Sequence, residues 1–223
     1  MKRSQINQYL AFAKEYFKKY HFRLPPWAFW SPADWAKAGA EYDEIRQKML
    51  GWDLTDFGSG NFEDTGLLLF TLRNGSQEID AVKNYAEKLM IALPNQVTPI
   101  HYHVFKAEDI INREGGKLVM QLWYADQDNK LSDSSVSIQV DGVARMFSAG
   151  EKIRLSPGES VTIMPQVYHT FWAEEEACIV GEVSRANNDL EDNFFYQPTG
   201  RFPEITEDEP ASHLLCNEYP ANL

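Results

Sequence analysis

The chain has 223 residues, of which 43% are hydrophobic and 13% aromatic, enough to form a sizeable core without disulfides or a structural metal. Its 21 basic and 33 acidic residues give a net charge of −12, which opposes binding to nucleic-acid phosphates and to anionic membranes. Since no signal peptide is evident and no run approaches the ~18 apolar residues of a membrane-spanning helix, we expect a cytoplasmic protein with no nucleic-acid or membrane partner.

The N-terminal part, residues 1–60, is expected to be a helical extension packed on the main domain. Apolar side chains recur every three or four positions over residues 4–20, which is typical of an amphipathic helix. Residues 31–39 begin with a serine, a proline and, two positions later, an aspartate, a pattern that predicts a short capped helix. A further helix is expected over residues 41–49, whereas residues 53–60 have the composition of a loop.

The central part, residues 61–184, consists of short apolar segments separated by turn-forming residues. Because no helical segment intervenes, this pattern favours an antiparallel barrel or sandwich over a βαβ fold. The expected strands are residues 66–72, 85–93, 97–104, 117–124, 136–140, 151–155, 160–164, 169–173 and 177–184. Residues 185–223, rich in Pro, Asn, Asp and Glu, are expected to form an extended tail that wraps the barrel.

The stretch from His101 to Glu108 predicts a metal site. Side chains alternate along a strand, so His101 and His103 project from the same face. A short turn could bring Glu108 back beside them, and antiparallel pairing could add His169 from a distant strand. Three neutral imidazoles and a carboxylate suit a divalent transition ion such as Mn²⁺, Fe²⁺, Co²⁺, Ni²⁺ or Zn²⁺. The alternative, an ordinary hydrogen-bonded histidine, is the better interpretation for the two histidines outside these stretches.

Two stretches resemble the paired motifs of the cupin family. They are His101-x-His103-x₄-Glu108-x₆-Gly115 and Gly158-x₆-Pro165-x₃-His169. The resemblance implies a mainly β fold, a cupin double-sheet antiparallel β-barrel of jelly-roll type with N-terminal helices, in which the two motifs hold a divalent metal. The second motif departs from the general form, because it has Pro-x₃-His in place of Pro-x-Gly-x₂-His and lacks an asparagine four residues after the histidine. The metal ligands themselves are intact.

Segments outside these motifs resemble the cupin-type D-lyxose isomerases. They are residues 24–30 (LPPWAFW), 52–58 (WDLTDFG) and 199–204 (TGRFPE). The resemblance implies a homodimeric aldose–ketose isomerase that interconverts D-lyxose and D-xylulose, and often D-mannose and D-fructose. It also implies Mn²⁺ as the preferred ion, with Co²⁺, Zn²⁺ or Fe²⁺ as alternatives, and a small sugar as the binding partner.

Moving a proton between C2 and C1 of a sugar requires a base close to the metal, and a cation near the developing oxyanion lowers the barrier. Glu204, in the family-like C-terminal segment, is expected to be the base. Lys106, two residues before a metal ligand, is expected to bind the substrate and stabilise the oxyanion. Glu182 lies in an otherwise apolar strand, where a charge must be paired, so it is expected to face the cavity and bind substrate, and it is the next candidate for the base after Glu204. Trp123 and Phe171 are expected to line the sugar pocket.

Two other functions remain open from the sequence. An Fe²⁺-dependent dioxygenase would use the same three-histidine, one-glutamate site with open positions for O₂ and an oxidisable substrate. A non-catalytic sugar-binding cupin would keep the cavity without turnover. Anaerobic turnover of an aldose would exclude the first, and any turnover would exclude the second.

Overall fold

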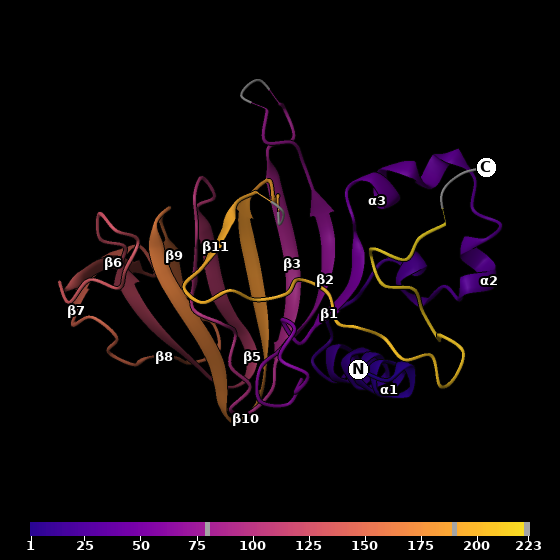
Figure 1. Cartoon of the computed structure of the whole chain (residues 1–223), viewed down its shortest axis with the longest axis horizontal. Coiled ribbons are helices and arrows are strands. Elements are labelled where there is room, and N and C mark those ends of the chain that lie inside the picture. The colour runs from indigo at the N-terminus through magenta and orange to yellow at the C-terminus, as the bar shows by residue number, and fades with distance from the viewer. Residues whose placement is uncertain (79–80, 189–190, 221–223) are drawn as a thin grey trace.

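A computed structural model describes residues 1–78, 81–188 and 191–220 and shows antiparallel strands with helices gathered beside one end of the sheet (Figure 1). The helical elements are α1 (Arg3–Lys19), η1 (Pro26–Phe29), α2 (Pro32–Trp35), η2 (Ala40–Tyr42) and α3 (Asp43–Gln47). The amphipathic helix is confirmed as α1, which buries Ile6, Leu10 and Phe17. The capped helix after Ser31 also forms, with its predicted capping box, but it ends at Trp35.

Eleven strands of the described chain pair in an antiparallel sense. They are β1 (Gly51–Thr55), β2 (Leu67–Asn74), β3 (Tyr85–Ala92), β4 (His101–His103), β5 (Glu108–Tyr124), β6 (Val136–Val140), β7 (Val143–Phe147), β8 (Ile153–Leu155), β9 (Ser160–Ile163), β10 (Val167–Arg185) and β11 (Asn193–Phe195). Among the described residues, no helix combines the length and the apolar character needed to cross a membrane.

The long strands β5 and β10 pair with each other and belong to two groups of strands. One half of each long strand belongs to a group in which the hydrogen-bonded neighbours follow the order β1-β2-β3-β10-β5-β9-β6-β7. The other halves pair with β4 and β8, and β4 in turn pairs with β11. A register shift between Glu174 and Cys178, opposite Gly115, separates the halves, as expected of a bulge that redirects a strand.

The main apolar core lies between these two groups, and a second core lies under the N-terminal helices. Leu69 and Met90 point into the main core with side chains of β5, β8 and β10. Their neighbours Leu68 and Phe70 point the other way and pack with the apolar face of α1. Alternation along β2 and β3 therefore lets the same strands cover the cavity on one side and bind the helix on the other.

Several boundaries differ from those predicted. The start of the expected loop 53–60 is strand β1, whose five residues are all buried against β2. The expected strands 169–173 and 177–184 are one continuous strand, β10, and the expected strand 97–104 is reduced to β4. The edge strand β7 and the short strand β11 were not predicted from the sequence.

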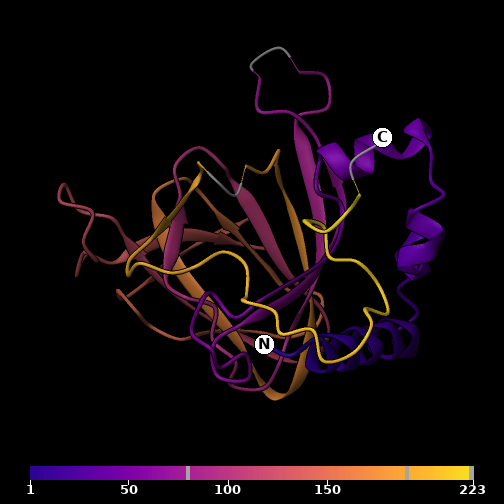
Figure 2. The same cartoon turned by 45° about the vertical axis from the view of Figure 1, so that its right-hand side comes forward.

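The C-terminal segment returns from β11 to the N-terminal helices, as both views show (Figures 1 and 2). The buried guanidinium of Arg3 donates hydrogen bonds to Glu207 at 2.6 Å and also pairs with Glu218. Tyr219 donates to the backbone carbonyl of Leu50 at 2.8 Å. These contacts fix the path of a segment that has little regular structure of its own.

Candidate metal centre and active site

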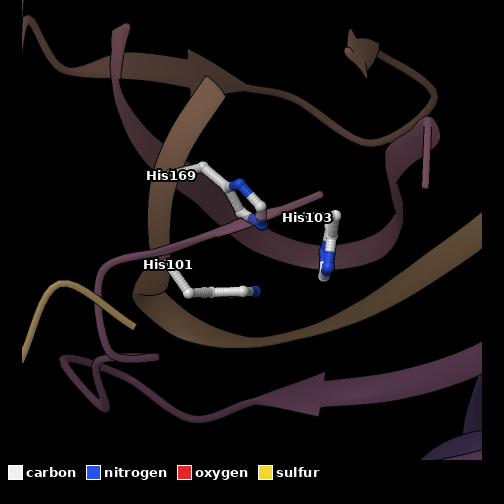
Figure 3. Close-up of side chains that lie close together, drawn as sticks. All are labelled: His101, His103 and His169. Carbon is white, nitrogen blue, oxygen red and sulfur yellow. The ribbon is translucent and has the colours of Figure 1, made fainter. Parts of the chain in front are cut away.

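The four predicted metal ligands come together in one cavity between the two groups of strands. His101 and His103 are the ends of β4, Glu108 begins β5, and His169 lies on β10 directly opposite His101. Directly opposed residues of an antiparallel pair project to the same face, which explains how His169 joins the other two histidines. Figure 3 shows the three imidazoles directed toward a common space.

The spacing of the donor atoms fits one ion. One ring nitrogen from each of His101, His103 and His169 lies within 4.8 Å of the others. The Oε1 atom of Glu108 is 3.3 Å from Nε2 of His103 and 3.1 Å from Nε2 of His169. Ligand atoms that share a divalent ion through bonds of about 2.1 Å stand roughly 3–3.5 Å apart, which matches the two Glu108 distances, and the three histidines form a group that could hold a metal ion.

Two of the three histidines have the tautomer that binds a metal fixed by a hydrogen bond. His101 and His169 each donate from Nδ1 to the backbone carbonyl two residues earlier, at 2.8 and 3.1 Å, which leaves the Nε2 lone pair for the cavity. Burial, together with the other two imidazoles, lowers the pKa of His101 well below its ordinary value. Burial and the charge of Lys106 lower the pKa of His103. Neutral imidazole is the form that binds a metal ion.

Lys106 connects the metal site to a second buried carboxylate. Its Nζ is 2.9 Å from Oε2 of Glu108 and 3.0 Å from Oε1 of Glu182, and Lys88 lies 3.2 Å from the same Glu182 oxygen. Burial by itself raises the pKa of each carboxyl group and is the largest single effect. Lys106 together with His103 and His169 outweighs it at Glu108, whose pKa falls well below its usual value, and Lys106 together with Lys88 lowers the pKa of Glu182. Two ionised carboxylates thus alternate with two ammonium groups.

The two predicted aromatic residues have different locations. Phe171 lines the cavity, because it follows His169 by two positions on β10 and shares its face. Trp123 is not among the residues that line the cavity. It is paired with Tyr168, the immediate neighbour of His169, and therefore projects from the opposite face of the sheet.

The predicted base Glu204 is exposed in the C-terminal segment and is not among the residues that line the cavity. Arg201, in the same segment, does reach the cavity wall, where Asp53 of β1 accepts hydrogen bonds from both terminal nitrogens of its guanidinium at 2.5 and 3.3 Å. Glu182, predicted to bind substrate and to be the second candidate for the base, is the second carboxylate of the cavity beside Glu108.

Sequence reasoning missed several residues of the cavity. Lys88 looks like an ordinary strand lysine, but it is paired across strands with Glu182, and the two face the cavity together. Asn193 and Phe195 of β11 lie opposite His103 and His101. Asn193 and Phe195 alternate with exposed side chains. This alternation would have indicated that both face the cavity only if β11 had been recognised as a strand.

Solved structures with a similar fold include two sugar isomerases. The L-ribose isomerase of Cellulomonas parahominis, solved with L-ribose, has a TM-score of 0.62 and 17% identity, with 92% of this chain and 98% of that chain covered. The L-ribose isomerase of Acinetobacter sp. DL28, in complex with L-ribose, has a TM-score of 0.60 and 15% identity over the same shares. At this level of identity the likeness is one of fold, and the predicted mainly β cupin-type class is confirmed.

The sequence relatives are more similar. The D-lyxose/D-mannose isomerase of Escherichia coli O157:H7 is 48% identical over 223 residues, which is 98% of both chains. The enzyme of the same name from Serratia proteamaculans is 45% identical, again over 98% of both chains. The model of the family described as D-lyxose isomerase matches residues 1–219. This chain therefore belongs to the D-lyxose isomerase family.

Proposed function

We propose that this chain, a sugar isomerase by its family, is a metal-dependent enzyme that interconverts D-lyxose and D-xylulose, and also D-mannose and D-fructose. The observation that carries the proposal is the position of Glu182. The ammonium of Lys106 lies between this buried carboxylate, at 3.0 Å, and the carboxylate of the proposed ligand Glu108, at 2.9 Å. An isomerase requires such a base, close to the metal but not bound to it. The names of the relatives at 45–48% identity support the choice of sugars.

The residues present fit a divalent ion, which His101, His103, Glu108 and His169 would hold. When bound, the ion supplies Lewis-acid stabilisation of the sugar oxygens at C1 and C2. We propose Mn²⁺ as the native ion, with Co²⁺, Zn²⁺ or Fe²⁺ as alternatives, because the set of three nitrogens and one carboxylate accepts each of these metals. Elemental analysis of protein purified without added metal tests this choice.

The proton transfer can be assigned to residues of this cavity. In the aldose-to-ketose direction, the Glu182 carboxylate accepts the proton of C2, and an enediolate forms as the C1 carbonyl oxygen gains negative charge. The Lys106 ammonium donates a hydrogen bond to this oxygen and stabilises the charge. Protonated Glu182 then returns the proton to C1, while the proton of the C2 hydroxyl passes to the C1 oxygen.

A coupled assay of the Mn²⁺-loaded protein with D-lyxose, D-mannose and D-xylose, without oxygen or a nicotinamide cofactor, tests the activity. We expect ketose from D-lyxose and D-mannose. Such turnover excludes both a dioxygenase and a non-catalytic sugar-binding protein. No ketose from any of the three sugars, with Mn²⁺ or Co²⁺, would refute the proposal.

Matched glutamine variants decide between the two carboxylates considered as the base. Glu182→Gln is expected to lower kcat by about 10²- to 10⁴-fold at normal metal content. The paired variant is Glu204→Gln, because the sequence alone indicated Glu204 as the base. This variant is expected to keep more than about half of the parent kcat, since the Glu204 side chain is exposed away from the cavity. The reverse result would show that the C-terminal segment supplies the base.

The homodimer and the cytoplasmic location are further proposals, supported by the family resemblance. Light scattering of the purified protein over a range of concentrations tests the dimer, and fractionation of producing cells tests the location. A monomer at every concentration would refute the first of these.

A further inference from the structure

Two buried polar atoms beside the proposed metal site have no hydrogen-bond partner among the described residues. They are Nδ1 of His103 and Oδ1 of Asn193, each exposing less than 1 Å². An unsatisfied buried donor or acceptor costs about 1–3 kcal/mol, so such atoms are uncommon in folded proteins. The two atoms are complementary, because Nδ1 carries a proton when Nε2 binds a metal and the amide oxygen accepts one.

We infer that Asn193 is a positioning residue for His103, whose Nδ1–H it accepts once a metal ion occupies Nε2. The inference rests on the proposed metal site and adds to it a residue that orients one of the ligands. Ligating histidines almost always donate their second ring N–H to a carbonyl or carboxylate oxygen, which fixes the ring and its tautomer.

The register of the strands places the two side chains together. Asn193 of β11 is directly opposite His103 of β4. Residues opposed in this way lie on the same face with Cβ atoms about 4.5–5.5 Å apart, a separation that an imidazole and an amide can bridge by side-chain rotation alone. The next pair on this face behaves as expected, since the rings of Phe195 and His101 stack at 5.3 Å. Asn193 also lines the cavity.

The other two histidines each have a hydrogen-bond acceptor for Nδ1–H, which His103 lacks within the described chain. The backbone carbonyl two residues earlier accepts Nδ1–H of His101 at 2.8 Å, and the same arrangement holds His169 at 3.1 Å. No such bond forms for His103 within the described chain. Asn193 is the cavity residue paired with His103, and its amide oxygen, which has no partner among the residues described, offers the acceptor that the backbone does not supply.

Asn193 is also held firmly enough to orient a ligand. The preceding residue, Asp192, is buried and accepts two backbone N–H groups from the turn after β4, from Val104 at 2.9 Å and from Phe105 at 2.7 Å. These bonds tie the start of β11 to the end of the strand that carries His103. The Asn193 amide therefore needs only a rotation of its side chain to reach the His103 imidazole.

Mn²⁺ titration of the chelator-treated, sugar-free protein by calorimetry provides the first test. Asn193→Leu keeps the size of the side chain and removes the acceptor, so its Kd for Mn²⁺ should rise about 10- to 100-fold. Asn193→Asp keeps an acceptor oxygen and should bind Mn²⁺ at least as tightly as the parent. Phe194→Leu, on the same strand but stacked on Tyr102 at the other face, controls for loosening of β11 and should stay within about twofold of the parent.

A spectroscopic readout separates orientation from loss of fold. In the Zn²⁺-loaded protein labelled with ¹⁵N-histidine, the Nδ1–H of His103 should exchange slowly with water in the parent and quickly in Asn193→Leu. The Nδ1–H signals of His101 and His169 should be unchanged, because their acceptors are backbone carbonyls. A structural collapse would change all three signals.

Unchanged Mn²⁺ affinity and unchanged His103 exchange in Asn193→Leu would overturn the inference. A raised KM for D-lyxose at parental metal affinity would also overturn it, because Asn193 would then contact the sugar instead. If the parent binds Mn²⁺ and loses affinity on Asn193→Leu but isomerises no sugar, the proposed function fails while the role of Asn193 stands.

Discussion

Replacing Lys106 with methionine is expected to destabilise the metal-free protein by about 3–5 kcal/mol, because the change leaves the buried carboxylate of Glu108 without a lysine counter-charge. Methionine has a similar length and no charge, so it fills the space of the lysine stem. The Lys106 side chain is only 2% exposed, and its ammonium lies 2.9 Å from Glu108 and 3.0 Å from Glu182. Glu182 retains Lys88 at 3.2 Å, whereas the described residues offer Glu108 no second lysine within ion-pair distance.

The magnitude follows from opposing contributions. At an effective dielectric constant of about 20, each contact at these distances contributes roughly 5–6 kcal/mol of Coulombic attraction. Removing the ammonium from water costs several kcal/mol and offsets much of this sum. Removing Lys106 from these buried pairs is therefore expected to cost free energy of unfolding in the range given above, well above the cost of losing a surface ion pair.

Urea denaturation at pH 7 with a chelator, at one protein concentration, measures the effect. Arg154→Met is the matched control, because Arg154 also lies 2.9 Å from a carboxylate, that of Glu174, but is 50% exposed. Its loss should stay below about 1 kcal/mol. If Lys106→Met costs no more than Arg154→Met, the reasoning that Lys106 neutralises two buried carboxylates is wrong.

The remaining predictions concern pH, metal and backbone. Burial lowers the pKa of His101 and His103, so the unfolded chain takes up protons that the folded chain excludes. The free energy of unfolding of the metal-free protein should therefore fall as pH drops below about 6.5, by at most about 2.7 kcal/mol per pH unit for the two groups. Urea denaturation between pH 8 and pH 5.5 checks this, and a flat profile would contradict it. Chelation should abolish turnover and Mn²⁺ should restore it, whereas His169→Ala should remain metal-free and inactive by elemental analysis and the coupled assay; full activity of that variant would exclude His169 as a ligand. Gly115 has φ of +96° and a backbone carbonyl where a Cβ would lie, so Gly115→Ala should cost roughly 2–5 kcal/mol in urea denaturation, and a change under 0.5 kcal/mol would count against this.

Part of the meeting of the four predicted ligands in one cavity was predictable, because it depends on short-range geometry. Alternation along a strand places His101 and His103 on one face whatever the rest of the chain does. The two motifs added Glu108 and His169, and the structure brings all four into one cavity. The amphipathic helix was predictable for the same reason, since its apolar spacing is local.

The rest of the cavity depends on which strands pair and in what register, and one sequence does not show this. Asp53 made its segment look like a loop, but it is buried in β1 because Arg201 approaches from the far end of the chain. Trp123 and Phe171 were equally plausible until the pairing of β5 with β10 put them on opposite faces. Glu204 was chosen as the base from its segment and Glu182 came second, because the contact of Glu182 with Lys106 and its pairing with Lys88 are known only from the structure.

The shared strands β5 and β10 also determine when the site can exist during folding. Glu108 and His169 belong to these two strands, which are far apart in sequence and must close a long loop before their contacts form. Pairings of this kind give high contact order and folding times in the millisecond-to-second range. We therefore expect the candidate ligand cluster to assemble late, after this pairing, so that only the folded chain could bind a metal ion. A bound ion would then slow unfolding without accelerating folding.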